Sequence, residues 1–89
     1  MKIPKKLKIG GHIDNVVEQD EVSGDGNTAG ECEIDKLEIR LRKGQKQSAK
    51  EATLFHEIIH ALNWEFEEKD VEFLAQALYQ VLKDNKLLK

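Results

Sequence analysis

The residues best suited to chemistry in this 89-residue chain are His56, Glu57 and His60, in the sequence His-Glu-Ile-Ile-His. Side chains four positions apart lie on one face of a helix, so a helix here would present the two imidazoles together. Glu57 would lie about 100° further round the helix axis, where its carboxylate flanks an ion held between the rings. The spacing therefore indicates a metal site with an acidic group beside it.

The segment around these residues favours a metal site over two unrelated histidines. Between Ala52 and Leu62 the only charged side chain is that of Glu57, whereas a surface helix normally carries Lys and Glu on its outer face. We therefore expect this helix to be covered on both faces. Histidines buried there need polar partners, and a metal ion supplies them. Zinc is the expected ion, at one per chain, because H-E-x-x-H on a helix is a zinc-binding pattern.

A hydrolytic zinc site takes three protein ligands, and the third is not in the motif. The longer pattern H-E-x-x-H-x-x-G-x-x-H is excluded, because Phe66 stands where its last histidine would be. Among the acidic residues that follow, Glu72 lies at the edge of the apolar stripe of the next predicted helix, so it is the preferred third ligand. Glu68, one turn earlier near the same edge, is the alternative, whereas Asp70 lies on the other side.

The C-terminal half is predicted to be two helices, because residues 48–89 contain neither glycine nor proline. The first covers 48–63 and begins at a capping box formed by Ser48 and Glu51. The second covers 67–84. Trp64 and Phe66 are expected to fill the corner between the helices. The core stripe of the second helix is predicted from three- and four-residue spacing to be Val71, Leu74, Ala75, Leu78, Val81 and Leu82.

The N-terminal half, residues 1–47, contains all six glycines and the only proline. Its short alternating segments predict strands at 5–9, 12–18, 31–34 and 37–42, with Leu37, Ile39 and Leu41 on one face of the last. Gly10-Gly11 is typical of a hairpin turn, and residues 23–30 are predicted to be a loop. These elements predict an α+β domain: an antiparallel meander of three or four strands packed on the two helices, in a single domain covering 1–89.

Composition narrows the class of protein. The net charge of −3 argues against nucleic acid as a partner, and no apolar run is long enough to span a membrane. Cys32 is the single cysteine, so no intrachain disulfide is expected, and the lysine-rich N-terminus lacks the apolar stretch of a secretory signal. A cytoplasmic protein is therefore expected. Cys32 itself is expected to be a small buried residue in preference to a zinc ligand.

The stretch Thr53–Leu62, with Glu72-x-x-Ala75 after a short loop, resembles the ImmA/IrrE-type metallopeptidases and related small phage-encoded gluzincins. The resemblance implies a zincin-like mini-domain. It also implies that His56, His60 and Glu72 bind zinc and that Glu57 is the general base. A phage-encoded member would work in the cytoplasm of the host cell.

The expected function is a zinc metalloendopeptidase acting on a peptide or protein substrate. The substrate is expected to lie along the strand Leu37–Arg42, with Tyr79 or His12 as candidate donors to the oxyanion. The alternative is a non-catalytic zinc-binding regulatory or interaction module on the same scaffold. Glu57 favours catalysis, because a purely structural zinc site has no use for an acid at that position.

Overall fold

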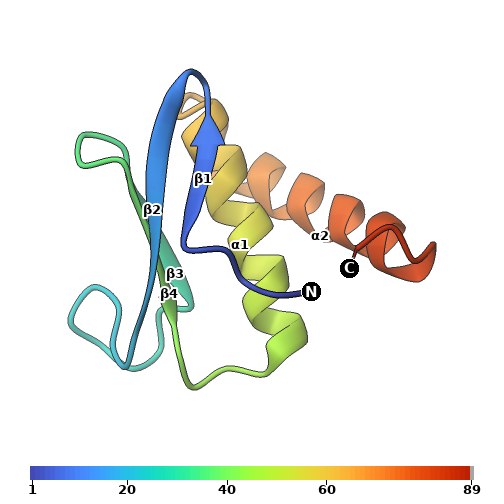
Figure 1. Cartoon of the computed structure of the whole chain (residues 1–89), viewed down its shortest axis with the longest axis horizontal. Coiled ribbons are helices and arrows are strands. Elements are labelled where there is room, and N and C mark those ends of the chain that lie inside the picture. The colour runs from blue at the N-terminus through green and yellow to red at the C-terminus, as the bar shows by residue number, and fades with distance from the viewer. Residues whose placement is uncertain (89) are drawn as a thin grey trace.

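The computed structural model describes residues 1–88 and has four strands followed by two helices. The elements are β1 (Lys6–Ile9), β2 (His12–Gln19), β3 (Gly30–Glu33), β4 (Glu38–Arg42), α1 (Gln47–Leu62) and α2 (Glu68–Asp84). Figure 1 shows three layers, in which α1 lies between the sheet and α2. The predicted α+β class is therefore confirmed, as is the expectation that the motif helix is covered on two sides. Within residues 1–88, neither helix is long and apolar enough to cross a membrane.

The strand order differs from a simple meander. The four strands are ordered β1-β2-β4-β3, and β2 pairs in parallel with β4. The Gly10-Gly11 hairpin between β1 and β2 is confirmed, with φ of 57° and 84°. The chain then passes beyond the position of β4 before it forms β3, and β4 returns between β3 and β2. Local alternation predicts strands but not their order, so the sequence did not reveal that β3 is an edge strand.

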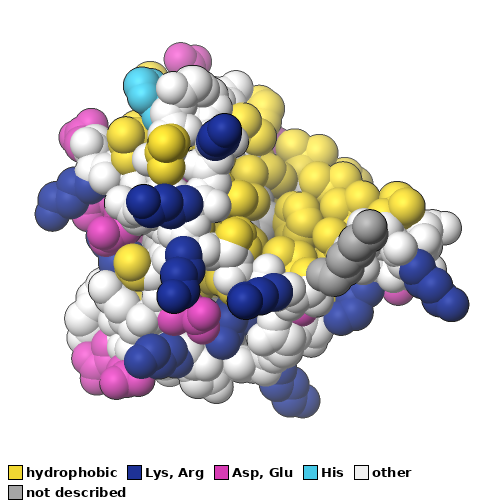
Figure 2. All heavy atoms as spheres, viewed as in Figure 1, with side chains coloured by type: hydrophobic (Ala, Val, Ile, Leu, Met, Phe, Trp, Pro, Cys, Tyr) yellow, Lys and Arg dark blue, Asp and Glu magenta, His cyan; other side chains and the backbone are white. Residues whose placement is uncertain are grey.

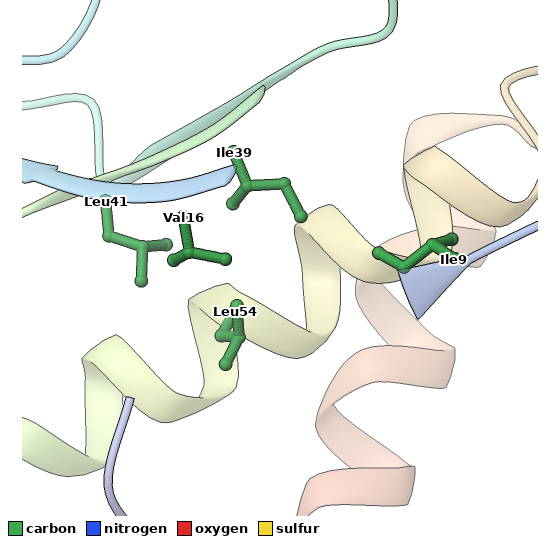
Figure 3. Packing of buried hydrophobic residues seen from close by; sticks show 5 residues of the cluster. All are labelled: Ile9, Val16, Ile39, Leu41 and Leu54. Carbon is green, nitrogen blue, oxygen red and sulfur yellow. The ribbon is translucent and has the colours of Figure 1, made fainter. Parts of the chain in front are cut away.

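The main core lies between the sheet and α1. Alternation along β4 places Ile39 and Leu41 on the face toward α1, as predicted, and both are fully buried. They pack with Val16 from β2, Ile9 from β1 and Leu54 from α1 (Figure 3). This cluster holds α1 against the sheet. It therefore sets the distance between the strands and the other side chains of α1.

Arg40 links β3 to β4 on the opposite face of the sheet. Its guanidinium group donates hydrogen bonds to Glu31 at 3.3 Å and to Glu33 at 2.7 Å, both on β3, and to Glu38 on its own strand. Charge-assisted bonds of this kind add to the backbone ladder. They strengthen the attachment of a four-residue edge strand that has only one neighbour.

The predicted capping box of the first helix is wrong. The helix begins one residue before Ser48, and its N-cap, Lys46, makes no side-chain capping bond. Glu51 is instead buried, and it accepts hydrogen bonds from Tyr79 at 2.7 Å and Gln47 at 3.0 Å. The amino group of Met1 lies 3.1 Å from the same carboxylate. The carboxylate therefore ties α2 to α1.

The predicted core stripe of α2 is only partly buried. Val71 and Ala75 pack against α1, but Leu74, Leu78 and Val81 are each more than two-fifths exposed. The reason is that α2 contacts α1 and no strand among the described residues, so only a narrow side of it is covered. Figure 2 shows the resulting apolar surface over the α2 part of the molecule.

The buried carboxylate of Glu51 predicts a loss of stability in acid. Burial alone would raise the pKa of Glu51, but hydrogen bonds from Tyr79, Gln47 and the amino group of Met1 outweigh it and hold the pKa at about 2. Because the folded pKa lies below the unfolded value, the stabilisation is complete above pH 4.5 and is lost as the pH falls toward 2. Urea titrations should show that Glu51→Gln lowers the free energy of unfolding by about 1–3 kcal/mol at pH 7.

That difference from the wild type should shrink steadily between pH 5 and pH 2, whereas Glu21→Gln, at an exposed acid, should lower the stability little at any pH. A difference for Glu51→Gln that stays constant over this range would contradict the role given to its charge.

Candidate metal centre

The two motif histidines face each other on one side of α1. Their Nε2 atoms are 3.2 Å apart, and the ring centroids are 4.9 Å apart. Two nitrogen ligands of one tetrahedral zinc ion, each about 2.0–2.1 Å from it, are separated by roughly 3.3 Å. The predicted placement of His56 and His60 is therefore confirmed, and their orientation suits a shared ion.

The third donor comes from the first turn of α2. The Glu68 carboxylate reaches both rings: Oε1 lies 2.5 Å from Nε2 of His56, and Oε2 lies 3.0 Å from Nε2 of His60. One ligand atom from each of the three residues lies within 4.8 Å of the others, and no other such group occurs in residues 1–88. Two imidazoles and one carboxylate form a donor set that zinc uses in hydrolytic sites. The residues present therefore fit the predicted ion.

Glu72 contacts the other nitrogen of the first histidine. Its Oε2 atom is 3.0 Å from Nδ1 of His56, and its Oε1 atom accepts a hydrogen bond from Gln76. A carboxylate at this position usually orients a ligand histidine and raises its basicity. The structure thus favours Glu68 as the third ligand, in place of the predicted Glu72. Helical periodicity places both acids at one edge of α2, but it does not show which turn of α2 lies against the histidines.

Glu57 is buried beneath the start of β3. Its side chain is 5% exposed, and burial raises its pKa well above the usual value, an effect that the charge of His56 opposes and that of Glu68 reinforces. A carboxyl group with a raised pKa can hold a proton near neutrality and release it. The position therefore suits the predicted general base.

Gly30 permits this close approach of the sheet to the helix. A Cβ atom there would lie 2.5 Å from Cγ2 of Thr53, 3.1 Å from the backbone oxygen of Arg40 and 3.2 Å from Oε2 of Glu57. No pattern in the sequence distinguishes Gly30, because a glycine at the end of a loop reveals nothing about what packs against it.

Two hollows meet at the site, and both are lined by Gly30, His56 and Glu57. The larger, of about 560 Å³, extends between α1 and α2 and is lined mainly by small or uncharged side chains. The smaller, of about 370 Å³, extends the other way and includes Trp64 and Glu68. An extended molecule could thus pass the metal donors with a hollow on either side.

The strand beside the site is β3, and this corrects the predicted binding strand Leu37–Arg42. That segment lies inside the sheet as β4, between β2 and β3, so both its edges are already paired. In the antiparallel β3–β4 pair, hydrogen-bonded and non-bonded residues alternate, and Arg42 donates to the oxygen of Ala29. By that alternation Gly30 and Cys32 direct their backbone groups to the open edge.

The two candidate donors to the oxyanion lie in different parts of the fold, and their role stays a prediction. The Tyr79 side chain lines the larger hollow, with its hydroxyl donating to Glu51 at 2.7 Å, whereas His12 lies on β2, two strands from β3. Trp64 is 69% exposed and Phe66 42%, so they do not fill the corner between the helices. Residue type alone predicts packing in the corner, whereas exposure depends on the path of the loop.

Cys32 packs against the core as predicted and is half-buried. Burial raises the pKa of its thiol to about 11, with the charges of Glu57 and Asp14 adding to the effect. The thiol is therefore neutral near pH 7. It does not belong to the group of potential metal ligands.

No family model, curated protein or solved structure matches the chain. The resemblance to small gluzincins therefore stays a prediction from the motif.

The contact at Gly30 predicts that a single methyl group will disturb the site. Gly30→Ala should lower the free energy of unfolding by about 1–3 kcal/mol, because Thr53 and the backbone of Arg40 must move to admit the Cβ atom. The control is Gly26→Ala, where a Cβ atom would meet nothing within 4 Å. Thermal unfolding of the two variants measures the difference, and equal stabilities would contradict the close approach.

Zinc binding should distinguish Glu68 from Glu72, the two acids of α2 that contact His56. Glu68→Ala removes an oxygen that reaches both Nε2 atoms, so its zinc affinity should fall further than that of Glu72→Ala. Glu72→Ala should weaken binding by about 10–100-fold, as expected for a residue that orients a ligand. Asp70→Ala, from the same turns of the helix, should bind zinc as the wild type does. Competition with a chromogenic chelator measures all three, and a larger loss for Glu72→Ala would restore Glu72 as the ligand.

Proposed function

We propose that this protein is a zinc-dependent metallopeptidase. The observation that carries the proposal is the pair of Nε2 atoms of His56 and His60, 3.2 Å apart and shared by the Glu68 carboxylate, directly beside the buried carboxyl group of Glu57. A structural zinc site needs four protein ligands and no buried acid beside them. Three donors, an adjacent acid and two flanking hollows together support a hydrolytic site.

The chain's own residues provide the proton transfers. When bound, zinc supplies Lewis-acid chemistry that activates water and polarises a carbonyl group. Glu57 accepts a proton from the attacking water, and it later donates that proton to the leaving amine. Its burial under Gly30 limits its contact with solvent to the two hollows that it lines. Glu72, through Nδ1 of His56, keeps that imidazole turned so that Nε2 faces the ion.

The substrate proposed for this site is a peptide in extended conformation. The backbone groups of Gly30 and Cys32 at the open edge of β3 can pair with it as an added strand. The hollows on either side of Glu57 would receive side chains from the two sides of the scissile bond. We place the protein in the cytoplasm, or in the host cytoplasm if a phage encodes it, since a single cysteine forms no intrachain disulfide and this fits a reducing compartment.

Cleavage of a defined peptide mixture, followed by mass spectrometry, tests the proposal. Glu57→Gln should keep its zinc but lose peptidase activity by about 10²–10⁴-fold, because only the proton transfer is removed. His60→Ala should lose both zinc and activity. Glu65→Gln, at an exposed acid of the helix connection, is the matched control and should cleave like the wild type. If wild type and Glu57→Gln bind zinc and are equally inert, the alternative of a non-catalytic zinc-binding module replaces the peptidase.

A further inference from the structure

The loop between α1 and α2 exposes the chain's only tryptophan next to the metal donors. Trp64 is 69% exposed, yet it lines the smaller hollow together with His56, His60 and Glu68. An exposed indole contributes little to the fold. Large aromatic side chains at the rim of a pocket commonly provide binding energy, because a ligand that covers them removes a large apolar area from water.

The lining of this hollow defines what it can receive. Trp64, Ile34 and Cys32 form its apolar wall, and Ile34 is 41% exposed. Its lining includes the acidic side chains of Glu31, Glu57 and Glu68, and no Lys or Arg from the described part of the chain, residues 1–88. Its volume of about 370 Å³ is enough for a large side chain. The hollow therefore suits a bulky apolar group and disfavours an acidic one.

The direction of β3 determines which part of a peptide reaches this hollow. Ala29 lines the larger hollow, whereas Cys32 and Ile34 line the smaller, so β3 runs from one to the other. Antiparallel pairing, which β3 already makes with β4, is the more stable arrangement per residue. A peptide added antiparallel to β3 would thus run from the Ile34 end toward Gly30. Its residues before the scissile bond would lie beside Trp64.

We propose that Trp64, with Ile34, is a specificity-determining residue that selects a bulky apolar side chain on the N-terminal side of the scissile bond. The inference rests on the proposed metallopeptidase function and names its substrate class: peptides with an aromatic or large aliphatic residue immediately before the cleaved bond.

Peptidyl hydroxamates test this directly, because the hydroxamate group binds the zinc while the residues before it extend in one known direction. The zinc-loaded wild type is titrated with acetohydroxamic acid, acetyl-Gly-hydroxamate and acetyl-Phe-hydroxamate. Trp64 is the only tryptophan, so its fluorescence reports occupancy of the hollow without any turnover. Acetyl-Phe-hydroxamate should bind about tenfold or more tightly than the Gly compound and shift the emission to shorter wavelength, since both apolar groups leave water.

Substitutions test whether Trp64 causes the preference for the Phe compound. Binding to Trp64→Ala is measured by calorimetry. Its preference for the Phe compound over the Gly compound should fall to about threefold or less. Its affinity for acetohydroxamic acid should match the wild type, which shows that the metal site is intact. Phe66→Ala is the matched control: this aromatic residue of the same loop does not line the hollow, and the variant should keep the full preference. A malonyl hydroxamate that carries Phe in the opposite direction should bind Trp64→Ala and wild type equally.

The results that would contradict the specificity role, the assigned direction and the proposed function differ from one another. Equal binding of the Phe and Gly compounds to the wild type, or an unchanged preference in Trp64→Ala, overturns the specificity role and leaves the peptidase proposal standing. If Trp64→Ala weakens only the malonyl compound, the assigned direction is wrong. If acetohydroxamic acid does not bind to zinc-treated protein at all, the proposed function fails and this inference fails with it.

Discussion

The candidate site depends on one contact between helices, in which the first two turns of α2 lie against the histidine face of α1. That contact brings the carboxylates of Glu68 and Glu72 to both ring nitrogens of His56. It is held at its far end by the buried bond from Tyr79 to Glu51 and between these points by Val71 and Ala75. Because α2 contacts no strand within residues 1–88, this single helix pair determines the geometry of the donors.

The concentration of acidic groups at this contact explains why a cation fits there. Glu57, Glu68 and Glu72 all lie around His56, and no Lys or Arg among residues 1–88 lines either hollow. Burial is the main cause of the raised pKa of Glu57, and the charge of Glu68 adds to it. Acids placed so close repel one another, and a divalent ion between the imidazoles would offset that repulsion. The same arrangement places the carboxyl group of Glu57 in one hollow with the three donors.

The sequence was sufficient for those parts of the structure that depend on local spacing. The motif helix, the pairing of His56 with His60 and the alternation of β4 follow from periods of 3.6 and 2 residues. It was insufficient where the outcome depends on how elements meet. Three features depend on packing between elements: the strand order, the exposed side of α2 and the choice of Glu68 over Glu72. Helical and strand periodicity do not predict that packing. The role of Gly30 belongs to the same group.

X-ray absorption at the zinc edge tests the central claim, one zinc ion held by His56, His60 and a carboxylate of α2, most directly. The zinc-loaded protein should show two imidazole nitrogens at about 2.0–2.1 Å and carboxylate or water oxygens at about 2.0–2.2 Å. The imidazole signal should be halved or lost in His60→Ala. A spectrum without imidazole, or with sulfur from Cys32 at about 2.3 Å, would contradict the proposed metal centre and the chemistry derived from it.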